Sequence, residues 1–473
     1  MRTQLYLWRR CARELWYTIA MQTGELNRRG FVAGVAAFAG LRTRADWLDF
    51  FKRDEAEPEN FHVLRRPFGS DPSREISLLG CGGVRLCVER NNQNRIDREL
   101  ATKIFDYSYR HGVNFFDTGY VYHGGDSEKF LNETLAKYPR ESFFFTDKMP
   151  TWHVKTLDDA KRIFKEQCER TAALGYFDVY MLHSISTPSQ YDTVYRKLGV
   201  LNFLKDMIAA GKIRRLGFSY HGTHKFLAEL VEEHPWALTL IPFNGAEPKG
   251  EPNRQVLAAK KIPIFVMSPL GGGRLAHLNS LARRHLAAAK PGVTPAEWGM
   301  RYAASFEGMQ TVLSGMSQVE QAVENVRTFS QERFEKLSEA DLAVYREAID
   351  LYNKFKPVAC TNCRYCECPY GIQIPEVFAW WNSFQGEGRV PADEGPNDSQ
   401  ELRREFLVSY YNTIPAPARA DRCVGCKKCK EGCPQWVFRI DTEMEKIAET
   451  VAHVREVYIS RGGRLHGKGA LPC

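Results

Sequence analysis

Eight short apolar runs between residues 78 and 315 constrain the fold more than any other feature of this chain. Stretches with the apolar period of an amphipathic helix lie between them. Eight strand–helix units over about 250 residues predict an α/β fold of the (β/α)8 TIM-barrel type. A doubly wound sheet is the alternative, but no Gly-x-Gly-x-x-Gly motif opens a helix after these strands. The predicted strands are Leu78–Gly82, Asn114–Thr118, Ser142–Lys148, Phe177–His183, Ile213–Tyr220, Leu238–Asn244, Ile262–Leu270 and Thr311–Gly315.

Polar side chains end several of these predicted strands. Asp117 lies near the end of the second run, Lys148 ends the third and His183 the fourth, and Tyr122 lies in the loop after the second. Because such barrels carry their active sites at the carboxyl ends of the strands, these four side chains can converge. A nearby ammonium lowers the pKa of a phenol from about 10, and a histidine can hydrogen-bond a carbonyl. The four residues therefore predict a site for proton donation.

Eight of the 13 cysteines form two short runs near the end of the chain, each followed by proline. The second run has the spacing C-x2-C-x2-C-x3-C-P of [4Fe–4S] ferredoxins, in which the fourth cysteine of each run binds the other cluster. The first run has one residue, not three, before its last cysteine. Zinc is the alternative, although zinc sites more often use two C-x2-C pairs. The predicted ligands of two [4Fe–4S] clusters are Cys360, Cys363, Cys366, Cys368, Cys423, Cys426, Cys429 and Cys433.

The N-terminal segment pairs Arg28 and Arg29 with the short apolar stretch Phe31–Leu41. That stretch is too short to cross a bilayer as a helix, so no integral membrane span is predicted. It resembles a twin-arginine export signal, which predicts export of the folded protein to the periplasm. A basic amphipathic helix on a cytoplasmic protein is the alternative, and either Met1 or Met21 can be the start.

The composition fits a soluble globular protein, with 44% hydrophobic and 26% charged residues. The net charge of +8 is not concentrated in a basic run, so nucleic-acid binding is not expected. We expect five segments: a leader at 1–45, a linker at 46–60, the barrel at 61–335, a small mainly α-helical, ferredoxin-like iron–sulfur domain at 336–460, and a tail at 461–473.

Over roughly residues 61–330 the sequence resembles the aldo-keto reductases, whose tetrad is Asp, Tyr, Lys and His in this order. The sequence around the C-terminal cysteines resembles a branch of that family with a ferredoxin-like extension. The matching barrel segments are Asn114–Tyr122, Ser127–Glu128, Thr146–Lys148, Val179–His183, Leu216–Ser219, Met267–Gly273 and Leu313–Gly315 through Asn325.

The resemblance implies that NAD or NADP binds without a Rossmann fingerprint. It makes Tyr122 the proton donor, Lys148 the group that tunes its pKa, Asp117 the partner of Lys148, and His183 the group that orients the carbonyl. The Lys and Arg that often hold a 2′-phosphate in the family are replaced by Gly315 and Gln321. The residues that match the family's cofactor contacts are Ser219, Ser268, Leu270, Gly271, Gly315, Gln321, Glu324 and Asn325.

These features predict an oxidoreductase that interconverts a small-molecule carbonyl and an alcohol with a nicotinamide cofactor and carries two clusters. An external electron carrier is a candidate partner, because nicotinamide transfers two electrons and a cubane normally one. One alternative is an electron-transfer or scaffold iron–sulfur protein with an inactive barrel, and another is a zinc-stabilised enzyme. The sequence leaves open whether the clusters carry electrons or only support the fold.

Overall fold

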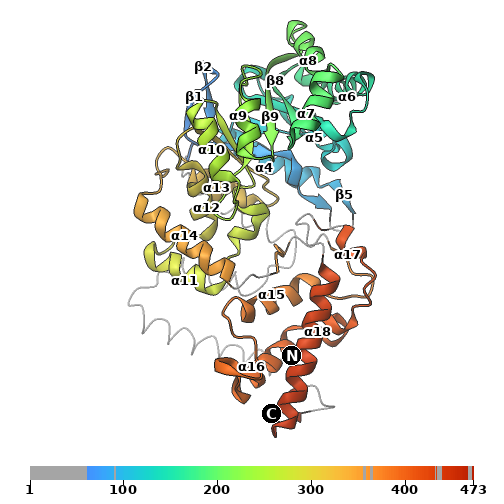
Figure 1. Ribbon diagram of the computed structural model, residues 1–473, viewed down its shortest axis with the longest axis vertical. Coiled ribbons are helices and arrows are strands. Elements are labelled where there is room, and N and C mark those ends of the chain that lie inside the picture. Colours follow the sequence, from blue (N-terminus) through green and yellow to red (C-terminus); the bar gives the residue numbers. More distant parts are fainter. Residues whose placement is uncertain are drawn as a thin grey trace, which may run out of the picture. The chain divides into compact units, whose positions relative to one another are not determined.

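The computed structural model describes residues 61–89, 92–354, 358–362, 366–431, 433, 439–466 and 471–472 (Figure 1). Residues 61–473 form one compact unit. The predicted leader, the predicted linker, Cys363 and part of the predicted tail lie outside the described residues.

Eight parallel strands close into a barrel, which confirms the predicted (β/α)8 fold. Around the barrel the strands follow one another in sequence order, and the last pairs with the first. Their register pairs Asp117 with Thr146 and His183 with Pro150 across neighbouring strands. The eight strands are β3 (Leu79–Gly82), β6 (Phe115–Asp117), β7 (Phe144–Pro150), β8 (Phe177–Ile185), β9 (Ile213–Tyr220), β10 (Thr239–Pro242), β11 (Ile264–Met267) and β12 (Met309–Ser314).

Helices cover the outside of the barrel because each presents one apolar stripe to the strands. Local signals fix where they begin: Asp97 accepts a hydrogen bond from the Leu100 amide, and Thr156 forms a capping box with Asp159. The barrel helices are α4 (Arg98–Arg110), α5 (Asp126–Leu135), α6 (Leu157–Arg170), α7 (Pro188–Tyr191), α8 (Val200–Ala209), α9 (His224–Leu230), α10 (Gly250–Ala259), α11 (Ser280–Ala289), α12 (Pro295–Ala304) and α13 (Val319–Thr328).

An antiparallel hairpin, β1 (Arg65–Phe68) and β2 (Asp71–Ser77), contributes side chains to the barrel interior. The Phe68 ring lies 5.3 Å from Phe144 and 6.1 Å from Phe265, edge to face in both cases. These partners belong to the first parts of β7 and β11, so the hairpin fills the amino-terminal end of the barrel. A second short hairpin pairs β4 (Val88–Glu89) with β5 (Asn92–Ile96).

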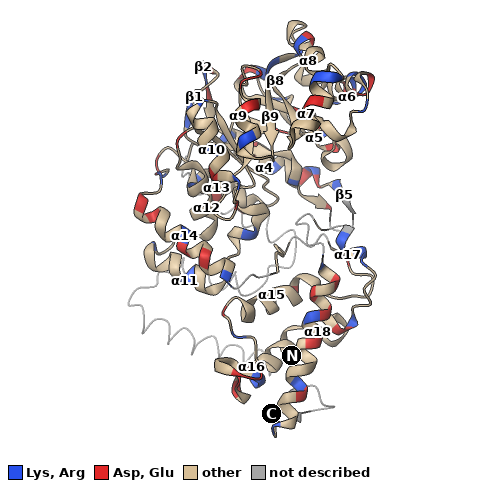
Figure 2. Cartoon of the chain, in the orientation of Figure 1, with Lys and Arg blue, Asp and Glu red and all other residues tan. Residues whose placement is uncertain are grey.

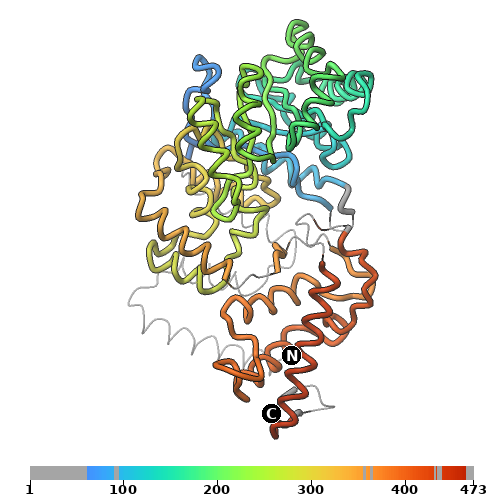
Figure 3. Tube along the Cα trace, viewed as in Figure 1, coloured from blue at the N-terminus to red at the C-terminus, as the bar shows by residue number. Residues whose placement is uncertain are grey.

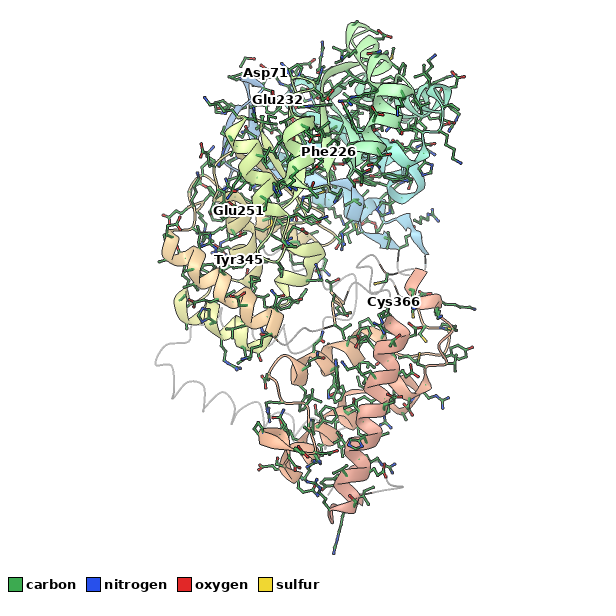
Figure 4. All side chains as sticks on the ribbon, in the orientation of Figure 1. Asp71, Phe226, Glu232, Glu251, Tyr345 and Cys366 are labelled. Atoms are coloured by element: carbon green, nitrogen blue, oxygen red, sulfur yellow. The ribbon has the colours of Figure 1, made fainter. Side chains whose placement is uncertain are left out.

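Helix α14 (Glu339–Lys354) packs with the barrel, although the sequence analysis placed residues 336–354 in the second domain. Leu342, Tyr345 and Ile349 belong to the same hydrophobic cluster as the barrel strands and helices. Tyr345, labelled in Figure 4, stacks on Trp298 of α12 with ring centroids 6.4 Å apart. The barrel unit therefore extends to the end of α14.

The remaining C-terminal region is mainly helical, as predicted. Its helices are α15 (Ile374–Gln385), α16 (Gln400–Thr413), α17 (Lys428–Glu431) and α18 (Ile440–Ser460), followed by the short pair β13 (Leu465–His466) and β14 (Leu471–Pro472) (Figure 3). Trp380 anchors a separate hydrophobic cluster, with ring contacts of 4.8 Å to Phe406 and 4.6 Å to Tyr410.

Charges of both signs lie along α6 and α18 (Figure 2). Among the described residues, we find no helix with the length and apolar character that crossing a membrane requires.

Candidate active site

Lys148 and Asp117 form a buried ion pair at the carboxyl ends of β7 and β6. Lys148 Nζ lies 2.7 Å from Asp117 Oδ2 and donates to the Thr118 carbonyl at 2.5 Å. Thr146 Oγ1 donates to the other Asp117 oxygen at 2.9 Å. Burial lowers the pKa of Lys148, but Asp117 and then Tyr122 outweigh it, and the net pKa is raised. Lys148 therefore stays charged at neutral pH.

Tyr122 lies directly beside this ion pair. The Lys148 ammonium is 4.7 Å from the centre of the Tyr122 ring. The sequence analysis expected Lys148 to lower the pKa of Tyr122. The ammonium does act in that direction, but burial of the phenol is the larger cause and the net pKa is raised. Tyr122 is thus a protonated phenol, placed to give a proton rather than to hold a negative charge.

His183 completes the group of four predicted residues. Its ring stands edge-on to Tyr122, with centroids 5.7 Å apart. Burial holds the pKa of His183 well below its usual range, and the charge of Lys148 lowers it further. The imidazole is therefore neutral, and its Nδ1 has no hydrogen-bond partner among the described atoms. A neutral imidazole has one N–H, which can hydrogen-bond a substrate oxygen.

Trp152, which the sequence analysis missed, forms part of the same mouth. It lies just after β7, is half exposed, and has its ring 4.9 Å from that of His183. Thr151 Oγ1 beside it donates to the His183 carbonyl at 2.6 Å and also bonds the Tyr195 hydroxyl at 2.7 Å. Tyr195 belongs to a π-helix at Asp192–Lys197. Only the position of Trp152 four residues after Lys148 could have signalled its role.

The residues that match the family's cofactor contacts lie on β9, after β11, and around the start of α13. Ser219 is buried and accepts a hydrogen bond from the Ser184 amide at 2.7 Å, so its own hydroxyl proton stays available. The loop from Ser268 to Gly273 has positive φ at Ser268, Gly271, Gly272 and Gly273. The backbone amides of such a loop can donate hydrogen bonds to phosphate oxygens.

The predicted contacts near α13 form their own hydrogen bonds. Gln321 accepts from the Ser317 amide at 2.9 Å, and Asn325 donates to Ser314 Oγ at 3.0 Å. Glu324 accepts from Thr294 Oγ1 at 2.5 Å. The first turn of α13 has no side-chain cap, so its amides suit a phosphate. These residues fit a nicotinamide dinucleotide.

Arg85 is a second residue that the sequence analysis missed. Its Nη1 donates to the Gly272 carbonyl at 3.0 Å. A Cβ at Gly315 would lie 2.9 Å from Arg85 Cβ, so the missing side chain at 315 leaves room for this arginine. The aliphatic stem of Arg85 therefore lies beside position 315, where the family's lysine is absent, and its guanidinium reaches the loop of Gly272. Leu270 is half-buried in the same loop.

The cysteine runs meet at one small cavity in the helical region. Cys368 of the first run and Cys423, Cys426 and Cys429 of the second line it. Burial, with smaller contributions from the other three, raises the pKa of Cys429 to about 11. Within the part of the chain that is described, no three His, Cys, Asp or Glu side chains are grouped so as to hold a metal ion. The described residues by themselves thus show no iron–sulfur site. Cys360, Cys366 and Cys433 pack against the helical cluster.

The model of the aldo/keto reductase family matches residues 79–343, more than half of the chain. The NADH-specific methylglyoxal reductase of Escherichia coli strain K12 is 30% identical over 139 residues, 26% of this chain and 41% of that protein. The 6-dehydroglucose reductase of Novosphingobium aromaticivorans is 25% identical over 230 residues, 46% of this chain and 74% of that protein. The match spans less than half of the first relative's own length.

Solved structures show the same barrel. A thermostable aldo-keto reductase in complex with epalrestat superposes with a TM-score of 0.50 at 20% identity, over 60% of this chain and 100% of its own. An aldo-keto reductase from Klebsiella pneumoniae in complex with NADPH gives a TM-score of 0.50 at 19% identity, over 61% of this chain and 95% of its own. With the family model covering the barrel and four family residues meeting at its mouth, the chain belongs to the aldo/keto reductase family.

Proposed function

We propose that this protein is an NAD(P)-dependent oxidoreductase that reduces a small aldehyde or ketone, or oxidises the matching alcohol. The observation that carries the proposal is the Tyr122 phenol beside a buried ammonium that Asp117 holds at 2.7 Å. A bound nicotinamide would supply or accept the hydride. Tyr122 gives its proton to the developing alkoxide, and Lys148 stabilises the phenolate that remains. His183 hydrogen-bonds the carbonyl oxygen and orients it.

The cofactor is NAD or NADP. Ser219 would contact the nicotinamide end, the loop from Ser268 to Gly271 the pyrophosphate, and Gly315, Gln321, Glu324 and Asn325 the adenosine end. One relative is named an NADH-specific reductase, and one structural neighbour holds NADPH, so relatives of both kinds exist. Arg85 beside Gly315 supports phosphate binding despite the lost family lysine.

We further propose that the helical region binds two [4Fe–4S] clusters. The cavity that joins Cys368 to Cys423, Cys426 and Cys429 supports this proposal, since the fourth cysteine of one ferredoxin run binds the cluster of the other run. By the same rule, Cys433 would complete the set of Cys360, Cys363 and Cys366. A cubane is a cage of several atoms, so its thiolates lie farther apart than those around one ion.

The two proposals are tested on one anaerobic preparation. We expect a brown protein with about eight iron and eight sulfide per chain, which binds NADH or NADPH and oxidises it with methylglyoxal or another small aldehyde. Stoichiometric zinc without broad absorption near about 400 nm would contradict the cluster proposal. Dinucleotide binding without turnover on a broad panel of aldehydes, ketones and alcohols would favour the alternative of an inactive barrel.

We also propose that residues 1–45 direct export by the twin-arginine route. Residues 1–60 fused to a reporter that works only outside the cytoplasm should give a signal in a host with this route. The double variant Arg28→Lys/Arg29→Lys should abolish that signal. A reporter that is silent, or one that ignores the substitution, would indicate a cytoplasmic protein.

A further inference from the structure

Arg170, the last residue of α6, contacts the loop that carries Tyr122. Its Nη1 lies 3.5 Å from the Tyr120 carbonyl oxygen, and its guanidinium lies 4.6 Å from the centre of the Tyr120 ring. The approach is close at the far end of the loop as well. A Cβ at Gly125 would lie 2.6 Å from Arg170 Nη1. Arg170 therefore contacts this loop at both Tyr120 and Gly125.

Arg170 also connects the loop to the strand of Lys148. Its Nη1 bonds Glu128 Oε2 at 2.6 Å. Gln167 donates from Nε2 both to Glu128 Oε1, at 3.1 Å, and to the Lys148 carbonyl, at 3.2 Å. Glu128 and Gln167 are fully buried, so water does not compete with the bonds between them, and Arg170 is partly exposed at the end of this path. The result is a continuous path of hydrogen bonds from the loop of Tyr122 to the backbone of Lys148.

Asp147 lies against the same path. It is fully buried, and its Oδ1 accepts from the Lys148 amide at 2.7 Å. Burial and then the neighbouring Glu128 raise the pKa of Asp147 well above its usual range. Asp147 thus holds its proton more tightly than an ordinary aspartic acid, and the neighbouring Glu128 is paired with Arg170.

We propose that Arg170 is a positioning residue, which through Glu128 and Gln167 holds the loop of Tyr122 at a fixed distance from Lys148. The inference rests on the proposed catalytic role of Tyr122. It goes further because Arg170 touches none of the four residues of the predicted tetrad. The reaction needs Tyr122 within reach of both Lys148 and the substrate oxygen, and a shift of about 1 Å can cost on the order of 100-fold in rate.

The test uses Arg170→Ala with Lys165→Ala as its matched control in the full-length protein. Lys165 is a cation on the same helix, α6, but it is mostly exposed and pairs with Glu169 at 3.8 Å, on the surface. Amide hydrogen exchange of residues 119–125 should speed up at least tenfold in Arg170→Ala and stay unchanged in Lys165→Ala. Unchanged exchange in a folded Arg170→Ala variant would overturn the proposal, whatever the activity.

Activity gives the second readout. In Arg170→Ala we expect kcat to fall about 10- to 100-fold, while dinucleotide Kd stays within about twofold. For alcohol oxidation the rising limb of the pH profile should move to higher pH. Lys148, the group that favours the phenolate, would then act less on Tyr122. Asp117 and Asp147 oppose ionisation of Tyr122, and His183, whose ring also faces it, is neutral. Added guanidinium should restore part of kcat in Arg170→Ala only.

Two outcomes separate this inference from the proposed function. Faster exchange at 119–125 in a protein whose wild type reduces no carbonyl would support the positioning role and contradict the reductase. A kcat that falls only in proportion to the folded fraction, with an unmoved pH profile, would overturn the positioning role. If Arg170→Ala does not fold, Arg170→Lys keeps the charge but loses the two-pronged contact and should show the same changes to a smaller degree.

Discussion

In the barrel, polar groups on neighbouring strands satisfy one another, whereas in the helical region the polar groups of interest lie at the edge of an apolar cluster. Lys148 has less than 2% of its side chain exposed and is held by Asp117 and the Thr118 carbonyl. Cys426 is exposed, and Cys423 and Cys368 are half-buried. The side chains of the barrel site are therefore held by protein partners, while three of the cysteines that line the helical cavity are partly or fully exposed.

The strongest test of this comparison is Tyr122→Phe. The variant removes the proposed general acid and should cut kcat by a factor on the order of 100 or more. Thermal stability and dinucleotide Kd should stay close to wild type, because the Lys148–Asp117 pair does not need the hydroxyl. Tyr109→Phe is the control, since it also loses a hydroxyl, one that bonds Ser142 on the outside of the barrel. Full activity in Tyr122→Phe would remove Tyr122 from the proposed mechanism.

Removing one of the proposed cluster ligands should affect the helical region and leave the barrel unchanged. In Cys429→Ser we expect about half of the iron, faster amide exchange in α15, α16 and α18, and dinucleotide binding within about twofold of wild type, since metal binding contributes folding free energy. Cys168→Ser on α6 should leave the iron content unchanged. If the barrel loses dinucleotide binding together with the iron, the two regions are one cooperative unit and the comparison fails.

Trp152→Ala should weaken the binding of the substrate and leave the binding of the dinucleotide unchanged. The half-exposed indole borders His183, and burial of an aromatic ring against a substrate is worth on the order of 1 kcal/mol. We expect KM for aromatic aldehydes to rise about tenfold, with a smaller change for methylglyoxal and none in dinucleotide Kd. Trp152→Phe should restore most of the effect. Equal changes for large and small aldehydes would place the indole outside the substrate pocket.

The smallest expected effect is in stability. The pKa of Asp147 is raised in the folded state, so the folded protein holds a proton that the unfolded chain releases above about pH 4. Stability contributed by Asp147 is therefore lost as pH rises from that value, at about 1.4 kcal/mol per pKa unit. Asp147→Asn should be more stable than wild type at pH 8, and the gain should vanish toward pH 4.

The free energy of unfolding, measured with denaturant across that pH range, tests this prediction. Asp178→Asn is the comparison variant. Asp178 is buried between Arg74, at 2.5 Å, and Arg140, at 2.8 Å. Its replacement should destabilise the protein because two arginines lose a buried partner. A destabilised Asp147→Asn at pH 8 would mean that Asp147 is ionised in the fold.

The barrel was predictable because parallel strands buried on both faces read as continuous apolar runs. The hairpin β1–β2 was not predicted because its sequence, from Arg65 to Ser77, is mostly polar, and Phe68 and Ile76 are its apolar residues that join the cluster inside the barrel. The helix α14 was predicted, but its apolar stripe does not indicate which part of the protein it packs against.

The candidate site was predictable in part for a similar reason. Residues at successive strand ends converge by topology, which brought Asp117, Lys148 and His183 together, with Tyr122 from the loop. The effect of Lys148 on the pKa of Tyr122 was predicted with the right sign, but the larger effect of burial was not foreseen, since no sequence pattern reports burial at a loop residue. Arg85 and Arg170 could not be predicted, because their partners lie far from them in the sequence and are brought close only by the fold.

The π-helix at Asp192–Lys197 bears on how this barrel can diversify. A π-turn holds about one residue more than an α-turn and often marks a functional site. Here Tyr195 lies in the widened turn, and its hydroxyl bonds Thr151 next to Trp152. Deleting one residue would rotate the flanking helix by about 100° and withdraw that hydroxyl. A single inserted codon can thus reshape the buried contacts next to Trp152, and relatives with a plain α-helix there should carry a different side chain at position 151.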